Sequence, residues 1–514
     1  MSEANKLKST LSSIFRRKGG SGHFTRLFDD LDPTQAAFLT NRVQLQSLKV
    51  VFELRLSPLA GMAFFLFTCF NITPLSASVP PPITFAPPLS FSAGGGWGGW
   101  SACAADLNRD GKTDVVVTVS ALGSWGICVL MGNGDGTFQA GLFTPLPLAP
   151  SCVALDDFNC DGKLDLAVSA MSDWAIPMPG FGEVYLLLGN GDGTFQSPTA
   201  YTAGHYCSSL AVADLDGDGK LDIVVTSQAT VVGLYYEGSV VILLGNGDGT
   251  FRKGGESSVG INPQAVYVND LNSDGKQDLV VANSWDGTIT VLLGNGDGTF
   301  LPGFSYATGG GATSIIGADF NRDGAYDLAV LNFNSADVAI FLGRGDGTFL
   351  DRINYPGGLN NCFSITAADF NRDGKSDLAL ADLSGARVRV LTGNGDGTFQ
   401  NAESVALNGG VQCVVAADVN CDGRCDLIAS ADGSILSLRN TTGDPSLDIA
   451  RGDGRVTIRW PFPATGFVLE TTTNILSRTW QSNTLNAVTN NGNWEVVVPL
   501  TERVMKSFFR LRKP

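Results

Sequence analysis

Short apolar runs and polar, glycine-rich runs alternate along most of the chain. In one unit, the apolar run SLAVA (209–213) leads into DLDGDGKLD (214–222), and two further apolar runs (222–227 and 240–244) precede GNGDGTF (245–251). Runs of this length that are rich in β-branched residues and bounded by turns predict strands. Gly-Asp-Gly between two such runs predicts a tight turn, and the Thr-Phe after it begins a fourth strand. Each unit is therefore predicted to form four antiparallel strands.

This unit recurs seven times. Each copy opens with a nine-residue loop that has Asp at positions 1, 5 and 9, Asn or Asp at position 3 and Gly at position 6. The loops span 106–114, 157–165, 214–222, 270–278, 319–327, 369–377 and 418–426, and their starts are 51, 57, 56, 49, 50 and 49 residues apart. A period near 50 residues with several short strands per unit is typical of a propeller blade. We predict an all-β fold whose main part is a seven-bladed β-propeller.

The last unit lacks an outer strand. Its third strand, SILSLRN (434–440), is followed by no GTF turn, whereas ITF (83–85) lies before the first loop with no loop ahead of it. We predict that residues 83–95 supply the missing strand. This pairing would close the ring and leave no open edge.

Different segments flank the repeats. Lys49 and Arg55, the apolar run 58–70 and the small residues 76–78 stand in the order of a secretory signal, with a buried hydrophobic segment as the alternative. The apolar run is shorter than the roughly 20 residues that a membrane-spanning helix needs. After Pro445, short strands separated by turns predict a small β-sandwich. The predicted domains are an N-terminal extension with a signal-like leader (1–78), the propeller (79–445) and the C-terminal β-sandwich (446–514).

Composition narrows the functional classes. The net charge of −16 argues against a nucleic-acid partner and suits a protein that carries bound cations. The chain has two histidines, His23 and His205, so Ser-His-Asp or Cys-His catalysis is nearly excluded. Two cysteine pairs have the same offsets from their loops, which predicts two local disulfides, with buried free thiols as the alternative: Cys152 with Cys160, and Cys413 with Cys421.

The nine-residue loops have the composition of calcium sites. Calcium binds about six to eight oxygen atoms from carboxylates, amide and backbone carbonyls, and water. Positions 1, 3 and 5 can point oxygens into one concavity, Gly at position 6 permits a sharp turn, and Asp at position 9 can bind bidentately. Asp216 makes loop three the only one with four carboxylates, and we expect it to bind calcium most tightly. We predict up to seven bound calcium ions, one in each nine-residue loop, and metal-free Asx-rich turns are the alternative. The Asp residues of the GNGDGTF turns are expected to cap those turns instead of binding metal. The predicted ligands are Asp106, Asn108, Asp110, Asp114, Asp157, Asn159, Asp161, Asp165, Asp214, Asp216, Asp218, Asp222, Asp270, Asn272, Asp274, Asp278, Asp319, Asn321, Asp323, Asp327, Asp369, Asn371, Asp373, Asp377, Asp418, Asn420, Asp422 and Asp426.

These loops, the apolar strands around them and the GNGDGTF turns resemble FG-GAP/VCBS repeats, which form the blades of the integrin α-subunit head and of many secreted bacterial proteins. The resemblance covers about 83–440 and implies a seven-bladed propeller with calcium in the first hairpin of each blade. The C-terminal segment resembles a β-sandwich appended to many exported bacterial proteins, on the strength of RWP (459–461), GFVLETTTN (466–474) and FFRL (508–511).

Aromatic residues gather in the connections at the other end of the predicted blades. The connections between the second and third strands of blades 2 and 3 (171–183 and 228–239) are longer than the others, and Trp100 lies in an inter-blade segment on the same face. Exposed aromatic side chains suit stacking on sugar rings or anchoring a protein, and packing between blades is the alternative. The candidate ligand-binding residues are Trp125, Trp174, Tyr235, Tyr236 and Trp285.

The sequence thus predicts a secreted or cell-surface, calcium-binding protein that binds an extracellular glycan or protein. It is expected to be monomeric, with no membrane span in the mature chain. An enzyme is not the favoured interpretation, because most Asp residues are committed to the loops. A polysaccharide-active lyase or hydrolase on the same scaffold is the alternative, and a purely structural surface protein is a third possibility.

Overall fold

The structure is a computed structural model of the chain. It describes residues 82–93, 98–121, 124–172, 181–232, 235–356, 361–400 and 403–443, together with the strands between residues 448 and 512. The signal-like leader lies outside the described residues, so its prediction is untested. The described part consists of strands and connections without a helix, which confirms the all-β class. Among these residues, no helix has the length and apolar character needed to cross a membrane.

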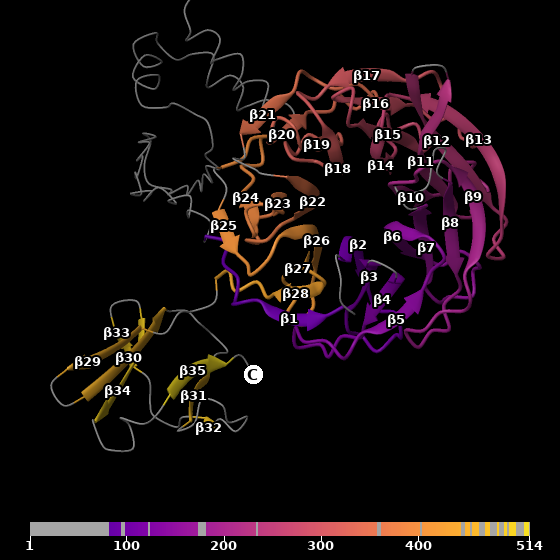
Figure 1. The fold of residues 1–514 in the computed structure, drawn as a ribbon. Coiled ribbons are helices and arrows are strands. Elements are labelled where there is room, and N and C mark those ends of the chain that lie inside the picture. Colours follow the sequence, from indigo (N-terminus) through magenta and orange to yellow (C-terminus); the bar gives the residue numbers. More distant parts are fainter. Residues whose placement is uncertain are drawn as a thin grey trace, which may run out of the picture. The chain divides into compact units, whose positions relative to one another are not determined.

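Seven four-stranded antiparallel sheets form the blades of a ring, and the predicted seven-bladed propeller is confirmed. The innermost strands surround the ring axis and the outermost strands lie at the rim (Figure 1). Blade 1 comprises β2 (Gly98–Ala105), β3 (Asp114–Ala121), β4 (Ser124–Leu130) and β5 (Leu142–Pro145). Blade 2 comprises β6 (Ala149–Asp156), β7 (Asp165–Met171), β8 (Gly182–Leu187) and β9 (Thr199–Gly204). Blade 3 comprises β10 (Leu210–Ala213), β11 (Asp222–Val232), β12 (Tyr235–Gly245) and β13 (Phe251–Val259).

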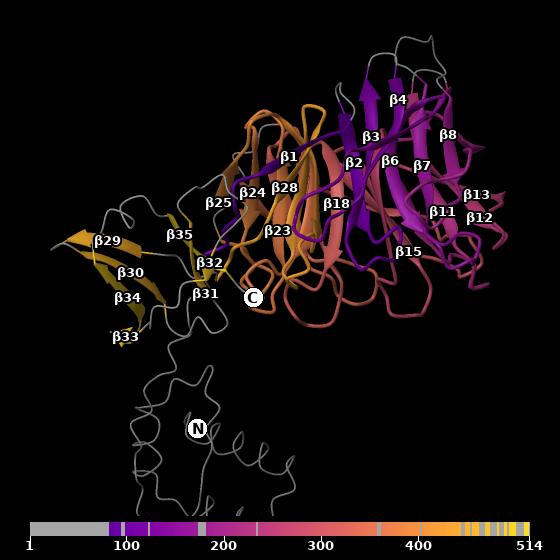
Figure 2. The same ribbon diagram turned by 90° about the horizontal axis from the view of Figure 1, so that it is seen from below.

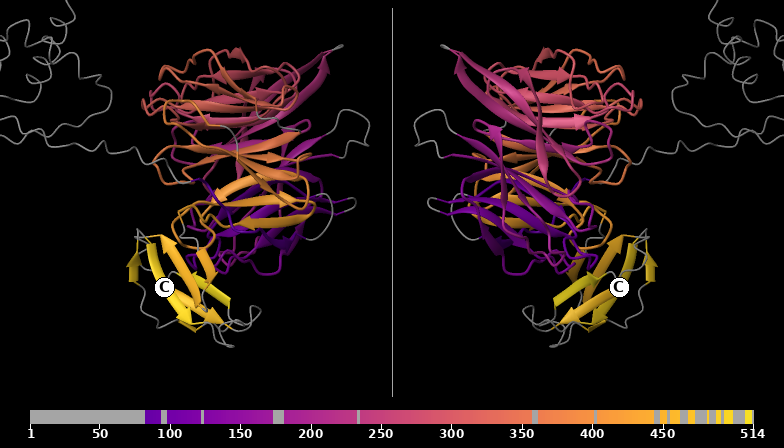
Figure 3. Two further views of the ribbon diagram at one scale, coloured as in Figure 1. Left: turned by 90° about the vertical axis from the view of Figure 1, so that its left-hand side faces the viewer. Right: turned by 90° about the vertical axis from the view of Figure 1, so that its right-hand side faces the viewer.

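The remaining blades repeat this order. Blade 4 comprises β14 (Pro263–Asn269), β15 (Asp278–Asn283), β16 (Thr288–Leu292) and β17 (Phe304–Ala307), and blade 5 comprises β18 (Ala312–Ala318), β19 (Asp327–Asn332), β20 (Asp337–Phe341) and β21 (Ile353–Pro356). Blade 6 comprises β22 (Cys362–Ala368), β23 (Asp377–Asp382), β24 (Arg387–Leu391) and β25 (Glu403–Ala406). Blade 7 comprises β26 (Val411–Ala417), β27 (Asp426–Ala431), β28 (Ser434–Leu438) and the N-terminal strand β1 (Leu89–Ser92). Figures 2 and 3 show the blades edge on.

The N-terminal strand closes the ring, as the sequence predicts. β1 pairs antiparallel with β28, with Leu89 opposite Ser437 and Ser92 opposite Ser434. A further bridge joins Phe85 to Asn440. The seventh blade is therefore built from both ends of the repeat region.

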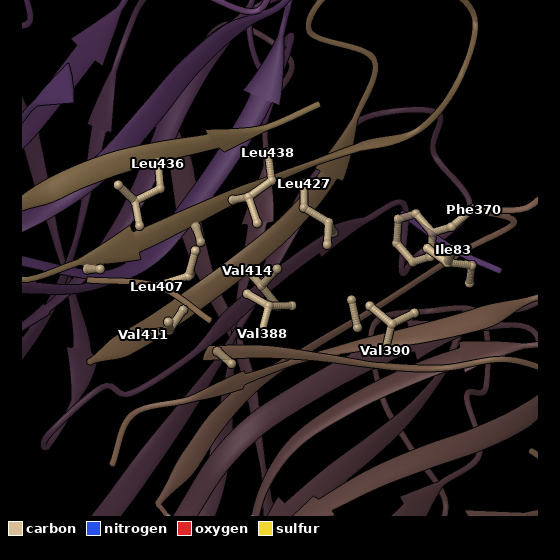
Figure 4. Close-up of a cluster of buried hydrophobic side chains, with 14 residues drawn as sticks. Ile83, Phe370, Val388, Val390, Leu407, Val411, Val414, Leu427, Leu436 and Leu438 are labelled. Carbon is tan, nitrogen blue, oxygen red and sulfur yellow. The ribbon is translucent and has the colours of Figure 1, made fainter. Parts of the chain in front are cut away.

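The hydrophobic core is divided into seven clusters, one at each junction between neighbouring blades. The cluster between blades 6 and 7 contains Val388 and Val390 of β24 together with Leu427 of β27 (Figure 4). The closing segment contributes Ile83 to the same cluster. Because the second and third strands are buried on both faces, they carry nearly continuous apolar runs, such as the fully buried DLAVLN of β19.

The C-terminal segment forms strands as predicted. β29 (Asp448–Gly452), β30 (Arg455–Pro461), β34 (Asn493–Pro499) and β33 (Val488–Asn490) make one sheet, and β32 (Gln481–Ser482), β31 (Val468–Thr472) and β35 (Phe508–Arg512) make another. Two small antiparallel sheets are the elements that a sandwich requires. Whether they pack as one stays a prediction.

The prediction of a loop at residues 228–239 in blade 3 is wrong. β11 and β12 continue through it as a long hairpin, in which Val231 faces Tyr236 and Val232 faces Tyr235, with a shift of register after Gln228. The β-branched and aromatic residues of this stretch favour a strand over a loop. The corresponding connection of blade 2 lies mostly outside the described residues.

The two predicted disulfides are absent, since all nine cysteines in the described residues are free thiols. Cys152 lies on the innermost strand β6, where its Sγ is 3.9 Å from the Leu210 carbonyl oxygen of the next blade. Cys160 instead lies exposed at position 4 of its loop. The equal offsets of the two pairs therefore reflect the register of the repeat and not a covalent bond.

Candidate metal centres and ligand face

The seven acidic loops have one geometry. Each loop joins the innermost strand of a blade to the second strand. The Asp at position 1 accepts hydrogen bonds from the backbone N–H groups of positions 5 and 6, in all seven copies. The side chain at position 3 also accepts from the N–H of position 5. The oxygens of positions 1 and 3 thus converge on the same point of the loop.

The backbone of each loop is left-handed at two positions. Gly at position 6 has a φ between 76° and 91° in the seven loops, as the sequence predicts. Position 4 is also left-handed, although six of its seven residues are not glycine, with φ near 60° at Arg109, Ser273 and Arg322. The single sequence signal for this conformation is Gly217, which occupies position 4 of loop three. The left-handed residues at positions 4 and 6 bring the side chains of positions 1, 3 and 5 to one side of the loop.

The Asp at position 9 has a second role that the motif does not reveal. It begins the second strand of its blade and is fully buried in every copy. In loop one, Asp114 accepts the N–H of Leu107 through Oδ2 at 3.0 Å and the N–H of Gly132 through Oδ1 at 2.7 Å. The same pair of bonds occurs in the other six blades, at 2.6–3.1 Å.

These bonds join two turns at one end of each blade. Leu107 belongs to the acidic loop, and Gly132 is the first residue of the GNGDGTF turn. In blade 7, which has no such turn, Asn440 takes the place of the glycine at 2.6 Å. A carboxylate has about four acceptor sites, so each oxygen of position 9 that accepts one N–H keeps a lone pair for a metal ion. The exception is Asp327 Oδ2, which also accepts the N–H of Asn321. The predicted bidentate binding therefore stays possible, and it stays a prediction.

Burial changes the acidity of position 9. Removal from water raises the pKa of all seven of these carboxyl groups above the ordinary value, although the two backbone N–H groups act in the opposite direction. The pKa reaches about 6 in Asp222, Asp327, Asp377 and Asp426. A bound cation offsets such a penalty, because it favours the charged form of its ligands.

Position 5 is paired with a neighbouring cation in six loops. The side chain at position 7 lies 2.6–3.8 Å from the position-5 carboxylate, for example Lys112 beside Asp110. Loop five has Ala325 at this position. The pairs of loops one to four are exposed and contribute little to stability, so an incoming divalent ion can displace them at low cost, whereas those of loops six and seven are partly buried.

Loop three shows the donor set most clearly. Oxygens of Asp214, Asp216 and Asp218 all lie within 4.8 Å of one another. Carboxylate oxygens at such spacing suit a calcium ion, whose Ca–O distances are about 2.3–2.6 Å. Arg252 Nη2 lies 3.4 Å from Asp216 Oδ2 and partly balances the extra charge of this loop. The residues present therefore fit a calcium ion.

The GNGDGTF aspartates cap their turns, as expected. Asp135 Oδ1 accepts from the Thr137 N–H at 3.0 Å and from its hydroxyl at 2.5 Å, and the other five copies repeat this pair of bonds. These bonds lower the pKa of Asp135.

Replacing Asp377 with alanine is expected to destabilise the metal-free protein by about 2–4 kcal/mol, because the Phe370 and Gly393 N–H groups lose their buried acceptor. Urea unfolding in EDTA measures this effect. The matched control is Asp369→Ala at position 1 of the same loop. Its carboxylate bonds two N–H groups near the surface, so we expect a much smaller loss in EDTA and a clear loss of the stabilisation by calcium. Equal effects of the two variants in EDTA would contradict the special role of position 9.

The predicted aromatic ligand residues do not form one cluster among the described side chains. Trp125 lies on β4 and is partly buried, opposite Ser120 of β3. Trp285 lies between β15 and β16 and is 66% exposed. Blades 2 and 3 separate them, and the side chains of Trp174, Tyr235 and Tyr236 lie outside the described residues.

A different aromatic row is present, and only Trp100 of it was anticipated. The Trp100 ring lies 5.7 Å from that of Phe363, which lies 5.1 Å from that of Phe333. The three residues belong to blades 1, 6 and 5. Sequence reasoning missed Phe363 and Phe333, because a phenylalanine at the start of an apolar strand, as Phe363 is, or directly after one, as Phe333 is, is normally part of the core.

The fold and the acidic loops define a β-propeller whose blades repeat the same hairpin geometry. The FG-GAP-like repeat family matches residues 171–225, 229–281, 270–330, 319–380 and 369–429, and the FG-GAP repeat family matches 98–137 and 208–243. The chain therefore belongs to the FG-GAP repeat family.

Curated relatives share part of this region. Phosphatidylinositol-glycan-specific phospholipase D from Bos taurus is 31% identical over 173 residues, which are 27% of this chain and 21% of the relative. Integrin alpha-PS5 from Drosophila melanogaster is 33% identical over 151 residues, 25% of this chain and 14% of the relative. The solved structure of a protein from Lactobacillus plantarum is similar over 61% of this chain and 86% of the solved chain, with 13% sequence identity and a TM-score of 0.45. The matches span about a fifth or less of the two curated relatives' length.

Proposed function

We propose that this protein is a secreted or cell-surface, calcium-stabilised binding or adhesion protein for an extracellular glycan or protein. One observation carries the calcium part: the oxygens of positions 1 and 3 converge in the same way in all seven loops, and three carboxylates approach within 4.8 Å in loop three. Up to seven ions would be held by positions 1, 3, 5 and 9. A bound ion supplies positive charge that neutralises these carboxylates.

The chain's own residues determine what calcium does here. Position 9 joins the acidic loop to the neighbouring turn, and position 1 holds the loop backbone. An ion bound to both would tie the first two strands of a blade to the turn that follows the third. Metal binding then adds to the free energy of folding. Its proposed role is structural, and the ligand binds elsewhere.

The proposed ligand face lies at the opposite end of the blades. The acidic loops and GNGDGTF turns occupy one end, and the exposed Trp285 and Trp100 lie at strand ends on the other. The likeness to segments of integrin α subunits favours a role in binding. A monomeric, extracellular protein fits these features.

Binding is tested by screening the calcium-loaded chain on glycan and extracellular-protein arrays. We expect retention of a glycan or a protein without release of cleaved product. The triple replacement of Trp174, Tyr235 and Tyr236 with alanine is expected to weaken binding at least about tenfold, and a melting curve of the variant checks that its fold is intact. Depolymerisation of a polysaccharide would instead support the enzyme alternative, and unchanged binding by the triple variant would move the ligand away from these residues.

A further inference from the structure

A β-bulge marks the start of the innermost strand in the blades. The extra residue stands six positions before the first Asp of the loop, as Ser151 does between Pro150 and Cys152. The registers of blades 4, 5, 6 and 7 skip Gln264, Thr313, Phe363 and Gln412 in the same way, and a wider irregularity in blade 1 contains Trp100. Ser208 is the equivalent residue of blade 3. Bulges re-aim side chains, and these seven equivalent positions all lie in the innermost strands or just before them.

In three blades the bulge residue is a hydroxyl that ties neighbouring blades together. Ser151 donates to the Cys207 carbonyl of the next blade at 2.6 Å, and Ser208 donates to the Pro263 carbonyl at 2.7 Å. Thr313 reaches the Cys362 carbonyl at 3.4 Å. This is a structural role that small residues fulfil.

Four blades lack this hydroxyl. Blade 4 carries Gln264, whose Nε2 donates to Asn262 Oδ1 within its own blade, and the three consecutive blades 6, 7 and 1 carry Phe363, Gln412 and Trp100. In a repeat whose other features recur, a change at three adjacent positions marks a local specialisation of the ring.

The three residues lie on neighbouring innermost strands. β26 lies between β22 and β2, which bear Phe363 and Trp100. The Trp100 and Phe363 rings, from the two strands that flank β26, lie 5.7 Å apart, and Gln412 is the equivalent position of β26. Gly99 permits this approach: its φ is 94°, and a Cβ there would lie 2.5 Å from Ser430 Cβ of blade 7.

These residues combine an accessible ring with an unused acceptor. Trp100 is 45% exposed, whereas Gln412 is 3% exposed. Gln412 Oε1 is buried and has no hydrogen-bond partner among the described residues. An unpaired buried acceptor costs about 1–3 kcal/mol, which a donor from a ligand can remove.

We propose that Trp100, Phe363 and Gln412, extended by Phe333, bind a neutral pyranose unit of a glycan. Aromatic faces contact the C–H groups of a sugar ring, and a sugar hydroxyl supplies the donor that Gln412 Oε1 lacks. None of the seven bulge residues is charged, which favours a neutral sugar over a cation or a uronate. The inference rests on the proposed glycan binding and assigns it a site on the innermost strands.

The test begins with neutral and acidic glycan arrays probed by the calcium-loaded full-length chain, followed by calorimetry with the tightest neutral hit. Trp100→Ala and Phe363→Ala are each expected to weaken binding at least about tenfold. Gln412→Leu, which keeps the buried volume, is expected to weaken it about three- to tenfold without lowering the melting temperature, because the variant loses an unpaired buried acceptor. Phe143→Ala is the control, because Phe143 is an exposed ring (43%) on the outer strand β5.

The outcomes separate this site from the general function. Neutral-glycan binding that survives Trp100→Ala and Gln412→Leu would overturn the site and leave the binding function intact. Retention only of uronates, basic peptides or proteins would overturn the sugar assignment alone. Failure to retain any glycan or protein would overturn both this inference and the proposed function.

Discussion

Deletion of residues 82–93 is expected to abolish the closed propeller or to lower its melting temperature by more than about 10 °C. The segment supplies β1, whose four residues pair with β28, and further backbone bonds join Ala86 to Arg439 and Ala93 to Gly433. Its side chains reach three blades, since Phe91 packs on Phe138 of blade 1 at 5.3 Å and Phe85 lies 6.1 Å from Phe370 of blade 6.

The expected magnitude follows from the buried side chains. Burial of a large apolar side chain stabilises a protein by about 1.5–3 kcal/mol, and Ile83, Phe85 and Phe91 are all buried or partly buried. The sum is comparable with the whole stability of an ordinary domain, about 5–15 kcal/mol. The deletion also leaves β28 as an open edge, which favours aggregation.

Thermal melting and light scattering after size exclusion measure both effects. A synthetic peptide of residues 82–93 added in trans should restore the melting temperature, whereas a peptide with Phe85 and Phe91 replaced by serine should not. A deletion variant that melts like the parent would show that the ring does not need this strand.

The spacing of the acidic loops and the hydrophobic pattern predicted the architecture, because the same four-stranded unit is repeated seven times along the sequence. The count of loops gave seven blades, and the missing turn after residue 440 identified the N-terminal segment as the closing strand. Both are properties of the order of elements along the chain, and the pairing of Leu89 with Ser437 confirms them. The long hairpin of blade 3 was missed, since a stretch with Gly233 and polar flanks resembles a loop when its partner strand is not known.

The finer chemistry depends on contacts that a linear motif does not contain. Asp114 looks like a metal ligand within its loop, but its second partner, Gly132, lies in the next turn. Cys152 and Cys160 share offsets with a second pair because they occupy repeat positions, whereas a disulfide requires their β-carbons to meet. The Trp100–Phe363 contact joins residues that are about 260 positions apart in sequence, from blades 1 and 6, whose innermost strands both flank β26 of blade 7.

Calcium removal is expected to lower the melting temperature by more than about 10 °C at pH 8, and by less at pH 5. A ligand at 100 times its dissociation constant stabilises the folded state by about 2.7 kcal/mol per site, and up to seven sites are proposed. The dependence on pH has two parts. Calcium binds the deprotonated carboxylates, so its contribution grows as the pH rises.

The metal-free protein should respond to pH in the opposite direction. The pKa of Asp222, Asp327, Asp377 and Asp426 is about 6 in the folded chain, above the ordinary 3.8. A carboxyl with a raised folded pKa stabilises folding when protonated, so this contribution is fully present below pH 3.8 and is lost as the pH rises through about 6. In EDTA these four groups therefore favour pH 5 over pH 8.

Melting curves between pH 5 and pH 8, each recorded with calcium and with EDTA, test both parts. The gap between the two curves should widen as the pH rises, and magnesium at the same concentration should close little of it, because Mg²⁺ demands near-octahedral geometry and gives up its water reluctantly. Asp216→Asn, which gives loop three the position-3 amide of the other six loops, should retain most of the gap. Curves that coincide with and without calcium at every pH would show that the seven loops are polar turns, held by position 9 alone.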